Sequence, residues 1–290
     1  LKALRARGVP SVVVNGTISA RSFRRFMKFG FFFREIFASI DLFCARTSDD
    51  MRKAVEAGVD PSKVRAFGNL KFDLDPEAPP PERIAVLRYN LGIGPADKVI
   101  VAGSTHAGEE AQVIRTFKVL RAEIPGLKLI IAPRHPERFS EVESLIAGTG
   151  LVWSRKTAPA GGEVILLDTV GELMTFYAVS TVAFVGGSLV EGVGGHNLLE
   201  PAFFSKPVVY GPRLTTYLGM AELLEEAGAG FRVEGEEGLT KTMRTLLLDG
   251  RLRVKAGDAA KKAVDANRGA AQKTIEAIEG FLSDRLGTAE

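Results

Sequence analysis

Short apolar segments alternate with amphipathic segments along most of the chain. Runs of β-branched and other apolar residues predict strands over residues 10–15, 42–45, 64–67, 99–102, 127–132, 164–167, 181–185, 207–210 and 230–233. Apolar residues at helical spacing predict helices over residues 1–7, 20–28, 31–40, 48–57, 83–91, 109–123, 136–147, 171–178, 198–205, 216–227 and 237–249, followed by two helices within 251–285. Strands separated by helices are typical of parallel sheets covered on both faces, so the sequence predicts an α/β fold.

A proline-rich segment divides this alternation into two parts. The sequence DPEAPPP over residues 75–81 is expected to be extended and stiff, and it predicts a linker. We therefore expect a first domain over residues 1–75, a second domain over 76–265, and a terminal helix over 266–290 that packs back on the first domain. The chain begins with a segment that resembles the end of a helix, so we also expect a fragment that lacks earlier βα units.

Charge is unevenly distributed along the chain. The formal net charge of +3 is too small to indicate a nucleic-acid partner. Residues 1–53, however, hold 11 Lys and Arg against 4 Asp and Glu, and eight Phe lie between Phe23 and Phe43. On the helix predicted over 20–28, basic and Phe residues interleave, which suits a membrane surface or an anionic amphiphile. Composition equally allows Phe residues that pack into a core and Arg residues that are solvated.

Several classes of site are excluded by residue usage. Cys44 is the only cysteine, so the chain has no internal disulfide and no cysteine-based metal cluster. It lies in an apolar run and is expected in the core. No carboxylates have the spacing of metal ligands, and neither a P-loop nor a G-x-G-x-x-G motif is present. We expect no metal site and no Ser-His-Asp arrangement around Ser188.

A glycine-rich loop lies between two predicted buried strands in segment 183–212. Its glycines, over 186–195, let the backbone adopt positive φ and let a ligand approach the main chain closely. His196, Asn197 and Glu200 follow at the start of a predicted helix. Ligands of open α/β sheets bind in loops that follow strands, so we expect a ligand site here. The alternative is an ordinary connection whose polar residues only cap the helix.

The three histidines of the chain each follow a predicted strand. They are His106, His135 and His196. Because the carboxyl ends of parallel strands meet at one edge of a sheet, we expect all three to line one crevice. Histidine is a partner for phosphate or hydroxyl groups whose charge is tunable near neutral pH.

Small residues precede the first histidine. Gly103, Ser104 and Thr105 stand at a predicted helix start, where backbone N–H groups can hold a phosphate. An ordinary Ser or Thr cap would have the same sequence. The acidic residues Glu109 and Glu110 in the first turn are expected to weaken the attraction for an anion.

Prolines flank the second histidine. Pro133 and Pro136 enclose Arg134 and His135, and a rigid arginine suits bidentate contact with phosphate. We expect Arg134 to be functional. Arg138 is expected to be structural, paired with a nearby glutamate at position 137 or 141.

A further loop, over residues 168–173, belongs to the same predicted edge. Thr169-x-x-Glu172 matches a capping box, so a structural interpretation is strong here. The loop nevertheless places hydroxyl and amide donors at the edge that carries the histidines.

Four motifs together resemble the 3-deoxy-D-manno-octulosonate (Kdo) transferases of lipid A assembly. They are GSTHAGEE (103–110), APRHPERF (132–139), DTVGEL (168–173) and FVGGSLVEGVGGHNLLEP (184–201). Two earlier segments, VNGTISARS (14–22) and FGNLKFD (67–73), resemble segments of that family in the same order. The resemblance covers about residues 9–217.

The resemblance implies a GT-B glycosyltransferase fold, with two Rossmann-like domains facing a cleft. It implies transfer of Kdo from CMP-Kdo to the 6′ hydroxyl of lipid IVA, a tetraacylated lipid A precursor, at the cytoplasmic face of the bacterial inner membrane. It implies no bound metal and no cofactor, since CMP-Kdo is a co-substrate. The implied partners are CMP-Kdo, an anionic glycolipid and the membrane surface, without nucleic acid.

The resemblance also implies roles for individual residues. Donor-binding residues would be Gly103, Ser104, Thr105, His106, Arg134, His135, Gly171, Glu172, Ser188, Gly194, Gly195, His196, Asn197 and Glu200. Acceptor-binding residues would be Asn15, Ser19, Arg21, Ser22, Arg24, Arg25 and Lys28. The anionic acceptor makes the membrane interpretation of the basic, Phe-rich segment the favoured one.

The general base of this family precedes the matched region, so we expect it N-terminal of Leu1. A fragment of this kind is expected to hold CMP and to transfer little Kdo alone. Two alternatives remain: another GT-B nucleotide-sugar enzyme, either a transferase or an epimerase, or a non-catalytic module that binds nucleotide or anionic lipid.

Overall fold

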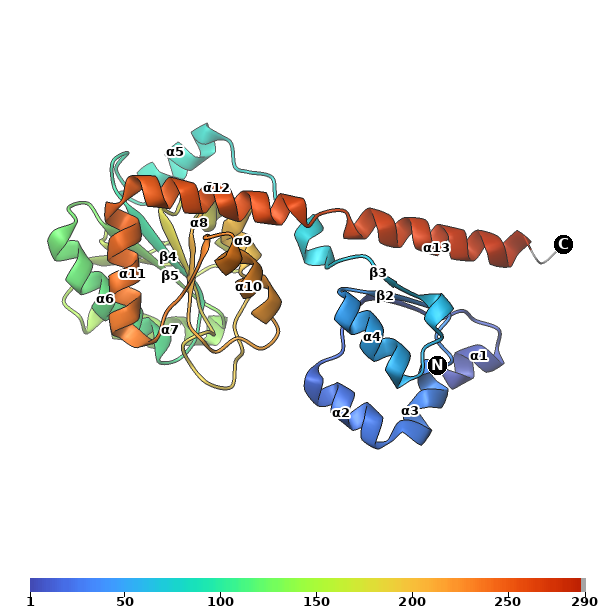
Figure 1. Cartoon of the computed structure of the whole chain (residues 1–290). Helices are drawn as coiled ribbons and strands as arrows, with labels where there is room; N and C mark the ends of the chain where they lie inside the picture. Colours follow the sequence, from blue (N-terminus) through green and yellow to red (C-terminus); the bar gives the residue numbers. More distant parts are fainter. Residues whose placement is uncertain (288–290) are drawn as a thin grey trace. The chain divides into compact units, whose positions relative to one another are not determined.

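The computed structural model describes residues 1–287 as two compact units. Unit 1 comprises residues 1–74 and the chain from Asp265 onward, and unit 2 comprises Asp75–Val264. Each unit is a separate α/β body (Figure 1). Within the described residues no helix combines the length and hydropathy needed to cross a bilayer.

Unit 1 is built on a small parallel sheet in the order β1-β2-β3. The strands are β1 (Val12–Gly16), β2 (Leu42–Ala45) and β3 (Val64–Ala66). The other elements are α1 (Lys2–Ala6), α2 (Ala20–Lys28), α3 (Gly30–Phe37), α4 (Ser48–Ala57), α13 (Ala270–Gly287), η1 (Pro61–Lys63) and η2 (Leu70–Asp73). Every residue of β2 is buried, including Cys44 as expected, and burial raises the pKa of its thiol.

Polar side chains fix the helix ends of unit 1. Ser19 caps α2 by accepting the N–H of Ser22. The cap of α4 is Thr47, which accepts the N–H of Asp50. Asp73 accepts hydrogen bonds from the N–H groups of Gly269 and Ala271, so this carboxylate holds the start of α13 against η2.

Unit 2 contains a seven-stranded parallel sheet in the order β10-β9-β8-β4-β5-β7-β6. The strands are β4 (Val99–Thr105), β5 (Lys128–Pro133), β6 (Trp153–Arg155), β7 (Val164–Leu166), β8 (Val182–Val185), β9 (Val208–Tyr210) and β10 (Gly230–Arg232). The helices are α5 (Pro81–Asn90), α6 (Glu109–Glu123), η3 (Pro136–Arg138), α7 (Phe139–Ala147), α8 (Leu173–Val179), α9 (Leu199–Ala202), α10 (Leu218–Glu226), α11 (Gly235–Leu248) and α12 (Gly250–Ala266).

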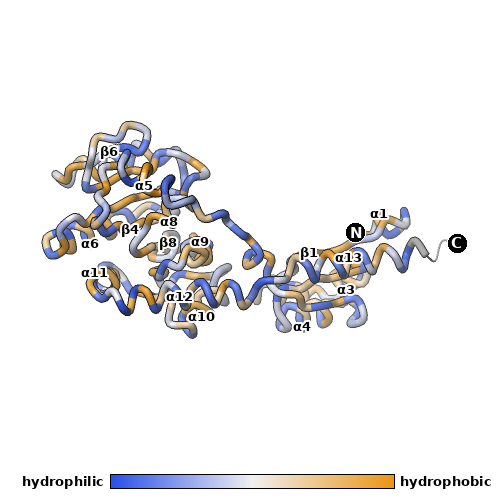
Figure 2. Tube along the Cα trace, turned by 90° about the horizontal axis from the view of Figure 1, so that it is seen from above, coloured by the Kyte–Doolittle hydropathy of each residue, from blue (hydrophilic) through white to orange (hydrophobic). Residues whose placement is uncertain are grey.

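Helices cover both faces of this sheet. On one face, Ile100, Leu129 and Phe184 join a single apolar cluster with residues of α6, α7 and α11. On the other face, Gly103 of β4 lies against Tyr177 of α8. Helices α11, α12 and α13 alternate between hydrophilic and hydrophobic residues along their lengths (Figure 2). The sequence pattern is therefore that of amphipathic helices around buried strands.

Two elements differ from the sequence prediction. Strand β6 was not predicted, because this three-residue edge strand has only one buried residue, Ser154, and follows the exposed Val152. The helix predicted over 198–205 is only the four-residue α9. It is followed by Ser205, whose φ of 54° lies in the left-handed region and cannot continue a helix.

The strand order creates a switch point at β4. The chain leaves β4 toward β5 on one side and returns to β8 on the other side. Loops that follow adjacent strands at such a point diverge and leave room for a ligand. The loops after β4, β5 and β8 carry the three histidines.

Candidate functional site

The three histidines lie together at the carboxyl edge of the unit 2 sheet, as predicted. The Nε2 atoms of His106 and His196 are 2.8 Å apart, and their rings are stacked with an interplanar angle of 11°. The ring of His135 stands edge-on to His106, with centroids 5.3 Å apart. The cluster thus joins loops that follow β4, β5 and β8.

Two of the three histidines, His106 and His196, have pKa values that are shifted toward the neutral form. Burial lowers the pKa of His106, and the neighbouring His135 lowers it further. Burial lowers the pKa of His196 to about 4, with further contributions from His106, Arg134 and His135. Uncharged imidazoles can both donate and accept hydrogen bonds, which suits contact with phosphate or hydroxyl groups.

A buried carboxylate organises the loops around the histidines. Glu109, the first residue of α6, has no exposed surface. Its two oxygens accept the N–H groups of Gly187, Ser188 and Leu189 in the glycine-rich loop, and that of His106 in the preceding loop. Burial raises the pKa of Glu109, and these four bonds oppose the shift. Glu109 therefore holds the two loops together, and its expected weakening of the attraction for an anion stays a prediction.

The glycines of the 186–195 loop allow close packing. A Cβ on Gly187 would lie within 3.0 Å of both Val193 and His196, and its φ is 67°. A Cβ on Gly194 would collide with Thr215, and one on Gly195 with Leu214. A cavity of about 490 Å³ adjoins this loop on the side of Arg213. The loop backbone therefore has the close contacts that the sequence suggested, and at these three glycines the contacts are with side chains of the protein itself.

Three of the predicted donor-binding residues are buried and packed against other parts of unit 2. A Cβ on Gly103 would overlap the hydroxyl of Tyr177, so this glycine allows a helix to pack on the sheet. Thr105 is fully buried. Ser188 is also fully buried, and its hydroxyl donates to the carbonyl of Val185 and accepts the N–H of Gly211. All three therefore support the site through packing, and their contact with the donor stays a prediction.

Two buried hydroxyls near the site have no partner within residues 1–287, and only one of the two residues, Thr105, stood out in the sequence. Among the described residues, Tyr177 Oη and Thr105 Oγ1 have no hydrogen-bond partner. Burial raises the pKa of Tyr177 well above its usual value, and Glu200 raises it further. No sequence signal marks Tyr177, because it looks like any apolar position of a helix.

The Arg134 loop matches its prediction in position. Arg134 and His135 are exposed at the end of β5, where solutes can reach them. His135 Nδ1 lies 3.7 Å from Glu137. Arg138 instead forms ion pairs with the buried Glu110 and with Glu141, at 2.6 and 2.7 Å. Arg138 is structural as expected, although the sequence did not identify Glu110 as its partner.

The 168–173 loop is not a capping box. The Thr169 hydroxyl donates to Glu172, but α8 begins only at Leu173, so Thr169 does not cap it. Glu172 also forms an ion pair with Lys156 at 2.7 Å, which lowers the pKa of its carboxyl. Gly171 is exposed with a φ of 88°. The candidate donor role of Gly171 and Glu172 remains a prediction.

The remaining candidates of this edge lie at the end of β4 and just after the glycine-rich loop. Ser104 is half-buried with a φ of 53°. Asn197 is half-buried and accepts the N–H of Leu199, as its capping role predicts. Glu200 is half-buried on α9. Their side chains lie at the same edge as the histidines.

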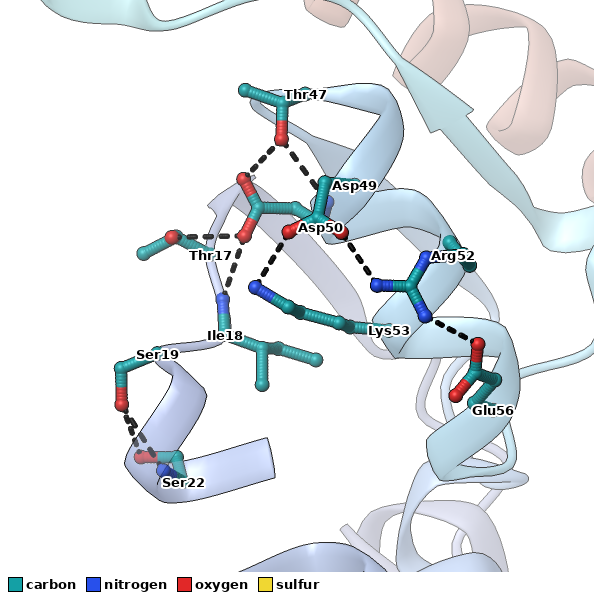
Figure 3. Close-up of polar contacts among 10 residues, drawn as sticks. All are labelled: Thr17, Ile18, Ser19, Ser22, Thr47, Asp49, Asp50, Arg52, Lys53 and Glu56. Carbon is teal, nitrogen blue, oxygen red and sulfur yellow. Dashed lines mark hydrogen bonds and ion pairs between the residues drawn. The ribbon is translucent and has the colours of Figure 1, made fainter. Parts of the chain in front are cut away.

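The candidate acceptor residues lie around the start of α2 in unit 1. A second buried carboxylate, Asp50 of α4, holds this segment (Figure 3). It accepts the Thr17 hydroxyl and the Ile18 N–H at 3.0 and 2.9 Å, and the hydroxyl of Thr47 at 2.8 Å. The sequence showed Asp50 only as an acidic residue in a first helical turn.

The polar candidates near α2 are partly engaged by the protein. Asn15 has a φ of 56° and accepts the N–H of Leu70, which fixes the end of β1. Ser19 and Ser22 hydrogen-bond to each other at the start of α2 (Figure 3). The basic candidates are exposed: Arg21, Arg24, Arg25 and Lys28.

The Phe residues of unit 1 divide into a group that packs on the core and a group that is exposed, and the membrane interpretation of the exposed group stays a prediction. Phe23, Phe26 and Phe37 pack against the core. Phe31 and Phe32 are 86% and 53% exposed on α3. The exposed pair lies near the basic residues in sequence, on an element that follows α2 directly. Within residues 1–287 no group of His, Cys, Asp or Glu could hold a metal ion.

Comparison with known proteins places these observations in a family. A model of the N-terminal part of 3-deoxy-D-manno-octulosonic-acid transferases matches residues 1–74. The chain is 32% identical over 282 residues to the transferase of Haemophilus influenzae, and 33% identical over 296 residues to that of Bordetella pertussis. It covers 65% and 66% of these proteins, which cover 95% and 97% of the chain, so it spans about two thirds of their length.

A solved structure decides the assignment. The C-terminal CMP-Kdo binding domain of WaaA from Acinetobacter baumannii is 30% identical, with a TM-score of 0.59 over 96% of that domain and 63% of this chain. The chain belongs to the Kdo transferase family. The UDP complex of HepE from Anabaena has a TM-score of 0.63 over 97% of the chain and 74% of HepE, at 16% identity. The likeness to HepE concerns the fold alone, and the fold is GT-B, as predicted.

Proposed function

We propose that this Kdo transferase homologue takes part in the transfer of Kdo from CMP-Kdo to lipid IVA during lipopolysaccharide biosynthesis. The observation that carries the proposal is the histidine cluster at the switch point of unit 2, in the part of the chain related to a domain named for CMP-Kdo binding. The relatives named as Kdo transferases support the reaction class.

In this proposal, unit 2 holds the donor at the carboxyl edge of its sheet. The exposed Arg134 offers a fixed guanidinium to the phosphate, and His106 and His196 offer ring nitrogens. Asn197 and Glu200 face the sugar and the ribose. Glu109 does not touch the donor and keeps the two loops in place. CMP-Kdo is a co-substrate, and we propose no cofactor and no nucleic-acid partner.

Unit 1 is proposed to hold the acceptor. The exposed basic residues of α2 would contact the phosphates of an anionic glycolipid. The exposed Phe31 and Phe32 of α3 would lie in the interfacial layer of the membrane. This arrangement is proposed for the cytoplasmic face of the bacterial inner membrane. During transfer the acceptor hydroxyl must lose a proton, and we assign no general base among residues 1–287.

Calorimetric titration with CMP tests the donor site. We expect the wild-type chain to bind CMP, and Arg134→Ala and His196→Ala each to weaken binding at least about tenfold, since a hydrogen bond to a charged group contributes about 1.5–3 kcal/mol. Arg244→Ala is the matched control, because Arg244 of α11 forms a surface ion pair with Glu123 of α6. Equal affinities in all four proteins would contradict the site assignment.

Sedimentation with vesicles tests the acceptor face. The joint replacement of Arg24, Arg25 and Lys28 by Ala should reduce binding to vesicles that contain anionic lipid, by about 1 kcal/mol per residue. Joint replacement of Arg52 and Lys53 is the control, because both residues pair with Asp49 on α4. If both triple and double variants bind as the wild type does, the basic residues are merely solvated.

A further inference from the structure

The contact between His106 and His196 limits how many protons the pair can hold. At 2.8 Å, one Nε2 must donate and the other must accept, so only one proton lies between the rings. Two imidazolium rings would each present an N–H at this point and repel. The pair is therefore either neutral or singly protonated.

The surroundings of the pair favour the neutral state in the free protein. His135 stands edge-on to His106, and Arg134 and Arg138 add positive charge from the loop after β5. The two acidic groups of α6 are already engaged. Glu109 accepts four backbone N–H groups, and Glu110 pairs with Arg138. Consistent with this, burial and the nearby cations lower the pKa values of both rings.

The pair can nevertheless accept one proton without losing its hydrogen bond. No group within residues 1–287 pairs with the Nδ1 atom of either ring. A proton that enters at Nδ1 of the donating ring makes it an imidazolium, and the Nε2–H···Nε2 bond stays in place. The charged pair costs desolvation and repulsion by Arg134. An anion beside the pair would offset both costs.

We propose that His106 and His196 form a proton-accepting dyad that takes up one proton from solvent when the donor phosphate binds beside it. This inference rests on the proposed function, which places the phosphate at this edge. During transfer the acceptor hydroxyl oxygen bonds to the anomeric carbon of Kdo and loses its proton to a base, while the bond between that carbon and the phosphate oxygen breaks and its electron pair stays on CMP. The added charge of the dyad stabilises this negative charge as it develops, so both histidines act on the leaving group.

The dyad makes nucleotide binding depend on pH in a defined direction. The free pair is neutral at pH 7, and the bound pair carries a proton, so CMP affinity should rise as pH falls from 8 toward 6.5. Protonation of the CMP phosphate, whose second pKa is about 6, also affects the measured affinity near that pH. Protonated His135 would also attract the anion, whereas Glu110 and Glu137 oppose it.

Calorimetry of CMP binding in buffers of different ionisation enthalpy measures the proton uptake. At pH 7.5 CMP is almost fully deprotonated, and we expect about one proton taken up per CMP bound. Uptake should disappear in His106→Asn and in His196→Asn, and it should persist in His135→Asn, which leaves the dyad intact. CMP binding without proton uptake, or uptake that persists in both dyad variants, would overturn the dyad.

Nitrogen NMR locates the proton in the wild-type protein. The chain has only three histidines, so six ring nitrogens can be assigned. On addition of CMP at pH 7.5, nitrogens of the His106–His196 pair should move toward imidazolium shifts. A proton found only on His135 or on the phosphate would contradict the proposal. If CMP gave neither heat nor shifts, the nucleotide assignment itself would fall, and the dyad with it.

Discussion

Two buried carboxylates determine the local structure of both candidate sites. Glu109 and Asp50 each lie in the first turn of a helix, and each accepts hydrogen bonds from a loop that follows a strand. A buried carboxylate without such donors would be costly, so the loops and the side chains stabilise each other. The sequence reveals the charge of such a residue and its helix start, but it does not reveal which loop folds over it.

Replacement of Glu109 should therefore loosen the site and the fold together. Glu109→Gln keeps the shape but turns an NH₂ group toward N–H donors, so we expect the free energy of unfolding to fall by about 2–4 kcal/mol. Urea unfolding measures this loss. Glu141→Gln is the control, because its pair with Arg138 is exposed and should contribute about 0.5 kcal/mol or less. Similar small losses of stability in both variants would argue against a role of Glu109 in holding the two loops together.

The hydroxyl of Tyr177 has no partner among the described residues, so we expect its removal to increase stability rather than reduce it. Tyr177→Phe removes a buried hydroxyl that has no partner among the described residues, so stability should rise by about 1 kcal/mol. Tyr210→Phe should lower stability by about 1–2 kcal/mol, because that hydroxyl donates to Glu225 at 2.9 Å. Thermal unfolding of the two variants should move in opposite directions, and a loss of stability in Tyr177→Phe would contradict this account.

The low pKa of His196 predicts acid sensitivity. The folded pKa is about 4, and the unfolded value is about 6.5, so between these pH values the unfolded chain binds more protons. Stability should fall as pH decreases through this window and should be unaffected by this group above it. The melting temperature of His196→Asn should fall less steeply between pH 6.5 and 4 than that of the wild type. Parallel profiles would show that His196 titrates normally.

At the scale of elements, the loops at the sheet edge were predictable and their packing was not. Periodicity and glycine placement located the loops after β4, β5 and β8, and the parallel sheet brought their histidines together. Edge strand β6 and the short α9 were mispredicted, because strand pairing and a left-handed residue, Ser205, override local propensity.

The glycine after β9 tests how closely these loops pack. A Cβ on Gly211 would lie 2.2 Å from the carbonyl oxygen of Ser188, so Gly211→Ala must displace the glycine-rich loop. We expect a loss of about 1–3 kcal/mol and weaker CMP binding. Gly219→Ala on α10 meets open space and should raise stability by up to about 1 kcal/mol. Unchanged stability and CMP affinity in Gly211→Ala would contradict the packing.

At the scale of the whole molecule, the chain forms two units and passes between them twice. It enters unit 2 at the proline-rich segment, which the sequence marked, and it returns to unit 1 before α13. The attachment of α13 depends on Asp73, which lies 196 residues before Gly269 and gives no local signal. Long-range capping of this kind is visible only in three dimensions.

Hydrogen exchange measures that attachment. Asp73→Asn should speed exchange at the first amides of α13 by an amount equivalent to about 1 kcal/mol, the usual contribution of a helix cap. Amides of β4 and β8 in unit 2 are the internal control and should not change. Faster exchange throughout both units would indicate general destabilisation instead.

The central claim is that unit 2 is built for a cytidine nucleotide, and competition between nucleotides tests it most directly. The fold alone also occurs in UDP-bound proteins such as HepE, so the fold cannot distinguish the two bases. Calorimetric displacement with the wild-type chain should show CMP binding at least about tenfold more tightly than UDP. Equal or tighter binding of UDP would contradict the Kdo transferase account and would favour another nucleotide-sugar enzyme.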